Sequence, residues 1–103
     1  MNKYKVLVSR SANDRMYDHF KFLANVSEKA ANKLLLQLTK DIQSLEYMPH
    51  NNPYLDRPYL QKAKYRYKLT YKRYRIVYQI MKDCVFIEDI QDCRQNDDKN
   101  LFN

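Results

Sequence analysis

Glycine is absent from this chain of 103 residues, although average usage is about 7%. Phosphate-cradling loops, dinucleotide fingerprints and nucleophile elbows all need glycine, because their backbone adopts positive φ angles or approaches a ligand closely. Nucleotide-dependent and serine-hydrolase chemistry of these kinds is therefore disfavoured.

Residues that hold metals or form disulfides are also scarce. The two histidines, His19 and His50, stand alone in the sequence and are expected at the surface, and Cys84 and Cys93 lack CxxC spacing. Two cysteines are too few for a disulfide framework and are expected to be reduced thiols. We predict no metal site and no cofactor.

Long apolar runs are missing as well. No stretch approaches the roughly 18 residues of a membrane span, and the start, MNKYKVLVSR, lacks the features of a signal peptide. We therefore expect a cytoplasmic protein with no membrane partner. With 45% apolar and 30% charged residues, the composition is that of a globular protein, and the length predicts one domain, 1–103.

Two amphipathic helices are predicted in the first half of the chain. The first spans residues 12 to about 24, with Ser11 as its N-cap and Asp14 in a capping-box position. Ser27 caps the second, which ends near Tyr47, just before a proline. The short connector predicts a hairpin whose apolar stripes meet one shared surface. The stripes are Met16, Phe20 and Leu23 in the first helix, and Ala31, Leu34, Leu35, Leu38, Ile42 and Leu45 in the second.

Strands account for most of the remaining chain. An opening strand is predicted over residues 3–9, and strands over 64–69, 73–81 and 84–91 are joined by short turns. Three prolines mark residues 48–61 as an ordered loop. The predicted fold class is α+β, with an antiparallel sheet made of the N-terminal strand and a three-stranded meander packed on the helical hairpin.

The positive charge of the chain is local. The net charge is +7, but residues 57–75 alone carry +8 with no acidic residue, so the rest of the chain is close to neutral. Such a cluster repels itself, which favours a polyanionic partner. Its members are Arg57, Lys62, Lys64, Arg66, Lys68, Lys72, Arg73 and Arg75, interleaved with Tyr59, Tyr65, Tyr67, Tyr71 and Tyr74.

Strand periodicity sorts part of this cluster into faces. Arg66 and Lys68 alternate with Tyr67 and Leu69, so cations and apolar residues project to opposite sides. If the apolar faces meet the helices, Arg66, Lys68 and Arg75 converge on the uncovered face, where a phosphate backbone fits. The alternative is a solvated face of scattered cations.

The order of elements is similar to that of a known family. Strand, two helices and meander, with YKLTYKRYRIVYQI at 67–80 and VFIEDIQDCR ending at Arg94, resemble the RelE/ParE family of toxins from bacterial type II toxin-antitoxin modules. The resemblance covers residues 3–94, and its most specific element is YRIVY at 74–78. It implies a RelE-like fold. One branch of this family cleaves messenger RNA in the ribosomal A site, and another inhibits DNA gyrase without being a nuclease.

The RNA-cutting branch implies a set of catalytic positions here. Its chemistry is attack of the substrate 2′-hydroxyl on the adjacent phosphate, with charge stabilisation and proton transfer by the enzyme. The resemblance assigns phosphorane stabilisation to Arg75 and Arg94, phosphate binding to Arg66 and proton transfer to Lys68. The residues expected to bind RNA around them are Lys62, Lys64, Lys72, Arg73 and Phe102.

One departure keeps the alternatives open. The RNA-cutting branch usually has a tyrosine or histidine shortly after the final arginine, and none follows Arg94. The first expectation is an endoribonuclease, an mRNA interferase acting with the ribosome and mRNA; the alternative is a gyrase inhibitor, and a third is a non-toxic nucleic-acid-binding module. The first two imply a cognate antitoxin, acidic and partly disordered, that neutralises the basic cluster.

Overall fold

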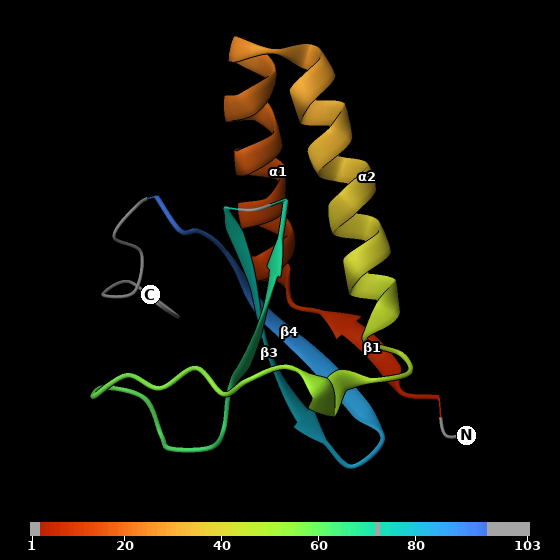
Figure 1. Cartoon of the computed structure of the whole chain (residues 1–103), viewed down its shortest axis with the longest axis vertical. Helices are drawn as coiled ribbons and strands as arrows, with labels where there is room; N and C mark the ends of the chain where they lie inside the picture. Colours follow the sequence, from red (N-terminus) through yellow and green to blue (C-terminus); the bar gives the residue numbers. More distant parts are fainter. Residues whose placement is uncertain (1–2, 72, 95–103) are drawn as a thin grey trace.

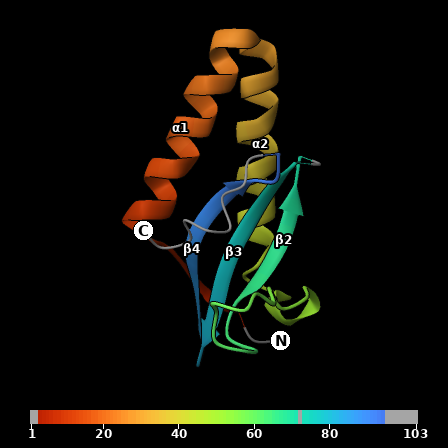
Figure 2. The ribbon, with the colours of Figure 1, turned by 90° about the vertical axis from the view of Figure 1, so that its left-hand side faces the viewer.

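The protein consists of a helical hairpin packed on one side of a four-stranded sheet, as Figure 1 and Figure 2 show. The computed structural model describes residues 3–71 and 73–94. The helices and most strands lie within about two residues of their predicted bounds, although α2 ends three residues before Tyr47. The elements are β1 (Lys5–Val8), α1 (Arg10–Val26), α2 (Glu28–Ser44), the short 3-10 helix η1 (Pro49–Asn51), β2 (Arg66–Thr70), β3 (Tyr74–Met81) and β4 (Cys84–Asp92).

The sheet confirms the predicted α+β class, but the prediction that the whole sheet is antiparallel is wrong. Its strand order is β1-β4-β3-β2, and β2, β3 and β4 form the predicted antiparallel meander. The first strand, however, pairs in parallel with β4, with Lys5 opposite Cys84 and Val8 opposite Ile87. The sheet is therefore mixed. After the helices, the chain enters the sheet at the far edge as β2, and the meander then brings β4 next to β1 in the same direction.

Two serines define the helical hairpin. The N-cap of α1 is Ser9 and not the predicted Ser11, because the Ser9 hydroxyl accepts the Ala12 amide at 2.9 Å and donates to the Glu88 carbonyl of β4 at 3.2 Å. Ser27 caps α2 as predicted, accepting the Ala30 amide at 3.1 Å. Its own amide also bonds the Leu23 carbonyl at the end of α1, so a single residue joins the two helices.

The core lies between the hairpin and one face of the meander. Leu34 and Leu38 of α2 are buried there, together with Ile76 and Tyr78 of β3. His19 of α1 is also buried, contrary to the expected surface position, with its Nε2 2.7 Å from the Ile90 carbonyl oxygen. This hydrogen bond satisfies the imidazole inside the core.

The loop between η1 and β2 covers part of the opposite face of the sheet. Leu55 is buried against Val77 of β3, with Tyr65 and Tyr67 packed around them. Tyr78 ties η1 and the start of the loop to the core, because its hydroxyl donates to the carbonyl of Pro49 in η1 at 2.6 Å and accepts from the Asn52 side chain at 3.0 Å. The meander is therefore covered on both faces near this loop.

Tight turns in this chain form without glycine. Ala63, Tyr71 and Lys82 have φ angles of 56°, 51° and 56°, in the left-handed region that glycine usually occupies. Tyr71 lies in the turn between β2 and β3, and Lys82 in the turn between β3 and β4. A side chain in this region costs roughly 1–2 kcal/mol, so at Tyr71 and Lys82 the pairing of the flanking strands must offset this strain.

Candidate interaction surfaces

Strand register divides the predicted catalytic cations between the two faces of the sheet. Arg66 and Lys68 of β2 lie directly opposite Tyr78 and Ile76 of β3, whereas Arg75 lies opposite Leu69. Directly opposite residues project to the same side of a sheet. Arg66 and Lys68 therefore share the face that the helices cover, and Arg75 projects from the other face. The predicted convergence of these three cations is wrong.

The physical reason lies in the edge position of β2. Leu69 is 58% exposed, and Tyr67 contacts the cluster around Leu55 and Val77 under the loop. The apolar side of β2 therefore does not face the helices, although the apolar side of β3 does. An edge strand has few neighbouring side chains on the face that the helices cover. The long side chains of Arg66 and Lys68 can therefore extend past the edge of the sheet to solvent.

Arg66 and Lys68 each bind groups outside the sheet. The Lys68 ammonium donates to the Ser44 hydroxyl at 2.9 Å and lies 4.0 Å from the Asp41 carboxylate. These groups are in the last turn of α2, where a cation is favourable. The Arg66 guanidinium donates to the carbonyl of Asn52 at 2.7 Å. Both side chains thus connect β2 to the preceding segments.

Arg75 and Arg94 also lie in separate environments. Arg75 donates twice to the Gln91 side-chain oxygen, at 3.0 and 2.8 Å, on the face opposite the helices. Arg94 follows β4, and its guanidinium lies 3.3 Å from the buried carboxylate of Asp92, on the helix-facing side with Tyr74. The predicted catalytic role of these residues stays a prediction, but their places do not form one phosphate site.

The predicted RNA-binding residues are similarly dispersed. Lys62 and Lys64 are exposed in the loop before β2. Arg73 lies 3.6 Å from the Asp92 carboxylate, which it shares with Arg94. Lys72 and Phe102 lie outside the described residues.

Burial raises the pKa values of two tyrosines in the core. The pKa of Tyr78 lies above its usual 10.0 because the side chain is buried, against the opposing effects of a hydrogen bond from Asn52 and the charge of Arg66. The pKa of Tyr74 is raised for the same reason, with Arg73 opposing and Asp92 reinforcing the shift. Both hydroxyls therefore stay protonated at neutral pH, and that of Tyr78 uses its proton in the hydrogen bond to the Pro49 carbonyl.

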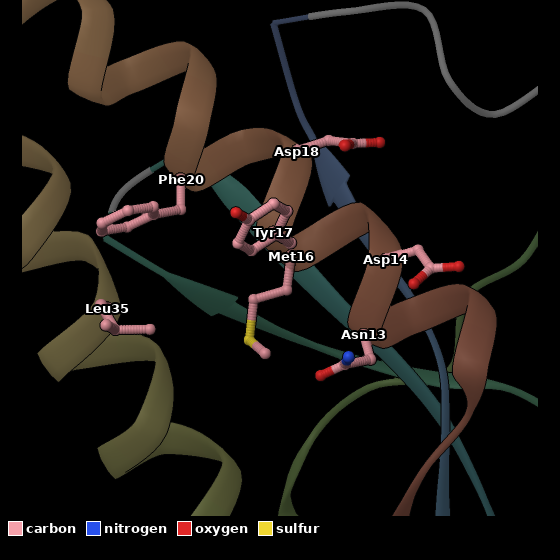
Figure 3. Close-up of a pocket in the computed structure, with 7 residues that line it drawn as sticks. All are labelled: Asn13, Asp14, Met16, Tyr17, Asp18, Phe20 and Leu35. Carbon is pink, nitrogen blue, oxygen red and sulfur yellow. The ribbon is translucent and has the colours of Figure 1, made fainter.

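An apolar groove runs along the hairpin, and the sequence did not predict it. Its volume is about 540 Å³. Figure 3 shows Met16 and Phe20 of α1 and Leu35 of α2 around the groove, while Asp14 and Asp18 point away from α2. Leu35 is 41% exposed, although its stripe predicted burial. Because the side chain faces the neighbouring helix and not the sheet, it remains accessible to a partner.

A second hollow, of about 320 Å³, lies beside the hairpin. Lys33, Leu36 and Lys40 of α2 line it, together with Gln37 and Tyr71. Leu36 is 73% exposed, and the two lysines place positive charge beside it. Apolar area flanked by charge of one sign is typical of a surface that binds a charged amphipathic partner.

The described part of the chain contains neither a cluster of metal ligands nor a membrane-spanning helix. Residues 3–71 and 73–94 contain no group of three or more histidine, cysteine, aspartate or glutamate side chains placed to hold a metal ion. Neither helix in these residues has the length and apolar character needed to span a bilayer.

Comparison with protein families decides the assignment. Residues 6–97 match the family described as the ParE toxin of the type II toxin-antitoxin system, parDE. The chain belongs to the ParE toxin family. It is therefore a toxin of a type II toxin-antitoxin system, and the ParDE arrangement implies a cognate antitoxin partner. This match supports the ParE side of the predicted RelE/ParE resemblance.

A solved structure shows the same fold. A chain of the chromosomal ParDE toxin-antitoxin system from P. aeruginosa superposes with a TM-score of 0.69 at 11% sequence identity. The match covers 87% of this chain and 96% of the other. No curated protein is similar enough in sequence to match. At 11% identity, the structural likeness extends to the fold and not to individual site residues.

Proposed function

We propose that this ParE-family toxin arrests growth by binding DNA gyrase and not by cutting messenger RNA. Family membership over residues 6–97 supports the proposal, because ParE toxins usually inhibit gyrase. Its action on gyrase would place the toxin in the bacterial cytoplasm.

The observation that carries the proposal is the division of the cations by strand register. A ribonuclease of the implied type needs charge stabilisation and proton transfer at one phosphate. Arg75 instead projects from the opposite face to Arg66 and Lys68. Lys68, the residue expected to transfer a proton, binds Ser44 and Asp41 of α2.

The antitoxin partner is expected to cover the hairpin. An amphipathic helix can place its apolar side in the groove around Phe20 and Leu35, as helix-in-groove recognition requires. Lys33 and Lys40 line the second hollow on another side of α2, where they can meet acidic residues from a different part of the antitoxin. The positive charge of residues 57–75 leads us to expect an acidic antitoxin, and the lysines of the second hollow fit the same expectation.

Replacing Lys68 with methionine is expected to leave growth arrest unchanged. The Lys68 side chain is 27% exposed and its ion pair with Asp41 spans 4.0 Å, so its loss should cost little stability. If Lys68 transferred a proton in RNA cleavage, its loss would lower activity about 10²–10⁴-fold. Colony counts after induced expression, at matched protein levels, measure the effect.

Lys29→Met is the matched control for this test, because it removes one exposed positive charge near the far end of the hairpin. Arrest by the Lys68 variant at the level of this control supports the gyrase proposal. Recovery of growth with Lys68→Met alone, from a folded protein, would overturn it in favour of the nuclease alternative.

A further inference from the structure

A basic cleft lies at the end of the molecule away from the hairpin connector. Its volume is about 270 Å³, below the roughly 300–1,000 Å³ of pockets that hold drug-sized ligands. Figure 1 shows the segments that form it, namely η1 with the following loop and the turn between β3 and β4, at the lower end of the sheet. The lining residues are His50, Tyr54, Ala63, Lys64, Arg66, Ile80 and Lys82.

The cleft gathers cationic side chains from separate segments. Lys64 precedes β2, Arg66 begins it, and Lys82 lies in the β3–β4 turn. None of the described residues that line the cleft is acidic. The nearest acid along the chain is Asp83, whose carboxylate accepts from the Cys84 thiol at 3.7 Å. Like charges held together in this way repel, and an anion bound between them relieves that repulsion.

The arginine of the cleft is held in place before any ligand binds. One terminal nitrogen of Arg66 donates to the carbonyls of His50 and Asn52, at 3.2 and 2.7 Å. Its guanidinium also lies over the Tyr54 ring at 4.0 Å. Asn52 in turn donates to the buried Tyr78 hydroxyl at 3.0 Å. A guanidinium fixed in this manner loses little freedom when it binds a phosphate in two-point geometry.

An aromatic ring beside the cations narrows the choice of ligand. The Arg66 guanidinium covers one face of the Tyr54 ring, but the side chain is 45% exposed, so a base can stack on the part of the ring that Arg66 leaves open. A carboxylate would use the cations alone, whereas a nucleotide can place its phosphate on the cations and its base on the ring. We propose that this cleft binds a phosphodiester group of a nucleic acid, with an unpaired base stacked on Tyr54. The proposal stands independently of gyrase.

Oligonucleotide binding by the full chain tests this site. Fluorescence anisotropy at low salt would follow labelled single-stranded DNA, single-stranded RNA and duplex DNA, each about 12 residues long per strand. The double variant Lys64→Ser/Lys82→Ser is expected to weaken single-strand binding about tenfold or more. It should also reduce the slope of log K against log salt by about 1.4, because about 0.7 is lost for each phosphate contact with a single strand.

Two controls distinguish binding in the cleft from nonspecific attraction to the positive charge of the protein. Lys21→Ser/Lys29→Ser removes the same charge from exposed positions near the hairpin connector and should change affinity less than about threefold. Tyr54→Leu should weaken binding of the single strands about tenfold while affecting the duplex less. The single-stranded DNA and RNA arms show which nucleic acid the cleft prefers.

Equal affinities for the cleft and control double variants, both folded by circular dichroism, would overturn the proposal. Binding of a polyglutamate peptide but of no oligonucleotide would also overturn it, since the cleft would then accept carboxylates. The assay contains no gyrase, so a failure here leaves the proposed gyrase inhibition intact. Conversely, gyrase inhibition can fail while the cleft still binds nucleic acid.

Discussion

Replacing Tyr78 with alanine is expected to lower the free energy of unfolding by about 3–5 kcal/mol, the usual cost of removing a large buried aromatic side chain. Tyr78 has no exposed surface and belongs to the core under the helices. Its hydroxyl is equally constrained, donating to the Pro49 carbonyl and accepting from Asn52. Chemical denaturation of the wild type and the variant measures the loss.

Tyr78→Phe separates the hydroxyl from the ring. Without the hydroxyl, the Pro49 carbonyl loses its partner, and the expected cost is about 1–2 kcal/mol. Amide exchange at Asn51, in the segment that the hydroxyl anchors, should become faster. Tyr17→Phe is the control because Tyr17 is exposed, and its effect should stay within about 0.5 kcal/mol. If Tyr78→Phe behaves like this control, the proposed anchoring is wrong.

The buried hydroxyls of Tyr74 and Tyr78 should make the protein less stable at alkaline pH. The pKa values of Tyr74 and Tyr78 are raised above 10.0 in the folded protein by burial. As the pH rises above 10, the unfolded chain releases these protons before the folded chain does, so the free energy of unfolding falls. The decline should be smaller in Tyr78→Phe than in the wild type, when both are denatured below and above pH 10.

Leu35→Asp is expected to weaken antitoxin binding by about 30-fold or more. The substitution places a charge in the apolar groove between α1 and α2, and a desolvated charge without a partner costs at least about 2 kcal/mol. Because Leu35 is already partly exposed, the loss of folding stability should be about 1 kcal/mol or less. Titration of the toxin with its purified cognate antitoxin measures the affinity.

The control for this variant is Asn32→Asp, which adds the same charge at an exposed position of α2 outside both hollows. The Leu35 variant should remain toxic in cells that also produce the antitoxin, whereas the Asn32 variant should be neutralised. Equal affinities for the two variants would show that the antitoxin does not use this groove.

Local sequence patterns were sufficient for much of the fold. Apolar residues at helical spacing predict both helices, and Ser27 is predictable as a cap because a cap hydroxyl accepts an amide only three residues along the chain, here that of Ala30. Turn residues between runs rich in tyrosine, valine and isoleucine predicted the meander that the register confirms. In each case the sequence signal, a helical period, a cap or a turn between two strands, lies in residues that are close together in the chain.

The errors concern contacts between distant segments. Ser9 displaces Ser11 as the cap because it also bonds Glu88 in β4. Val77 is buried with Leu55 of the loop, so β3 is apolar on both faces near this loop and its pattern cannot orient β2. Periodicity within β2 correctly separated Arg66 from Tyr67. It could not decide which side faces the helices, and the candidate site depended on that choice.

Gyrase supercoiling of relaxed plasmid DNA in the presence of the purified toxin tests the central claim most directly. We predict that supercoiling falls as the toxin concentration rises, and that added antitoxin restores it. At the same concentrations, a message translated by purified ribosomes should remain uncut. Full supercoiling at a toxin concentration that produces codon-phased cuts in the translated message would contradict the account.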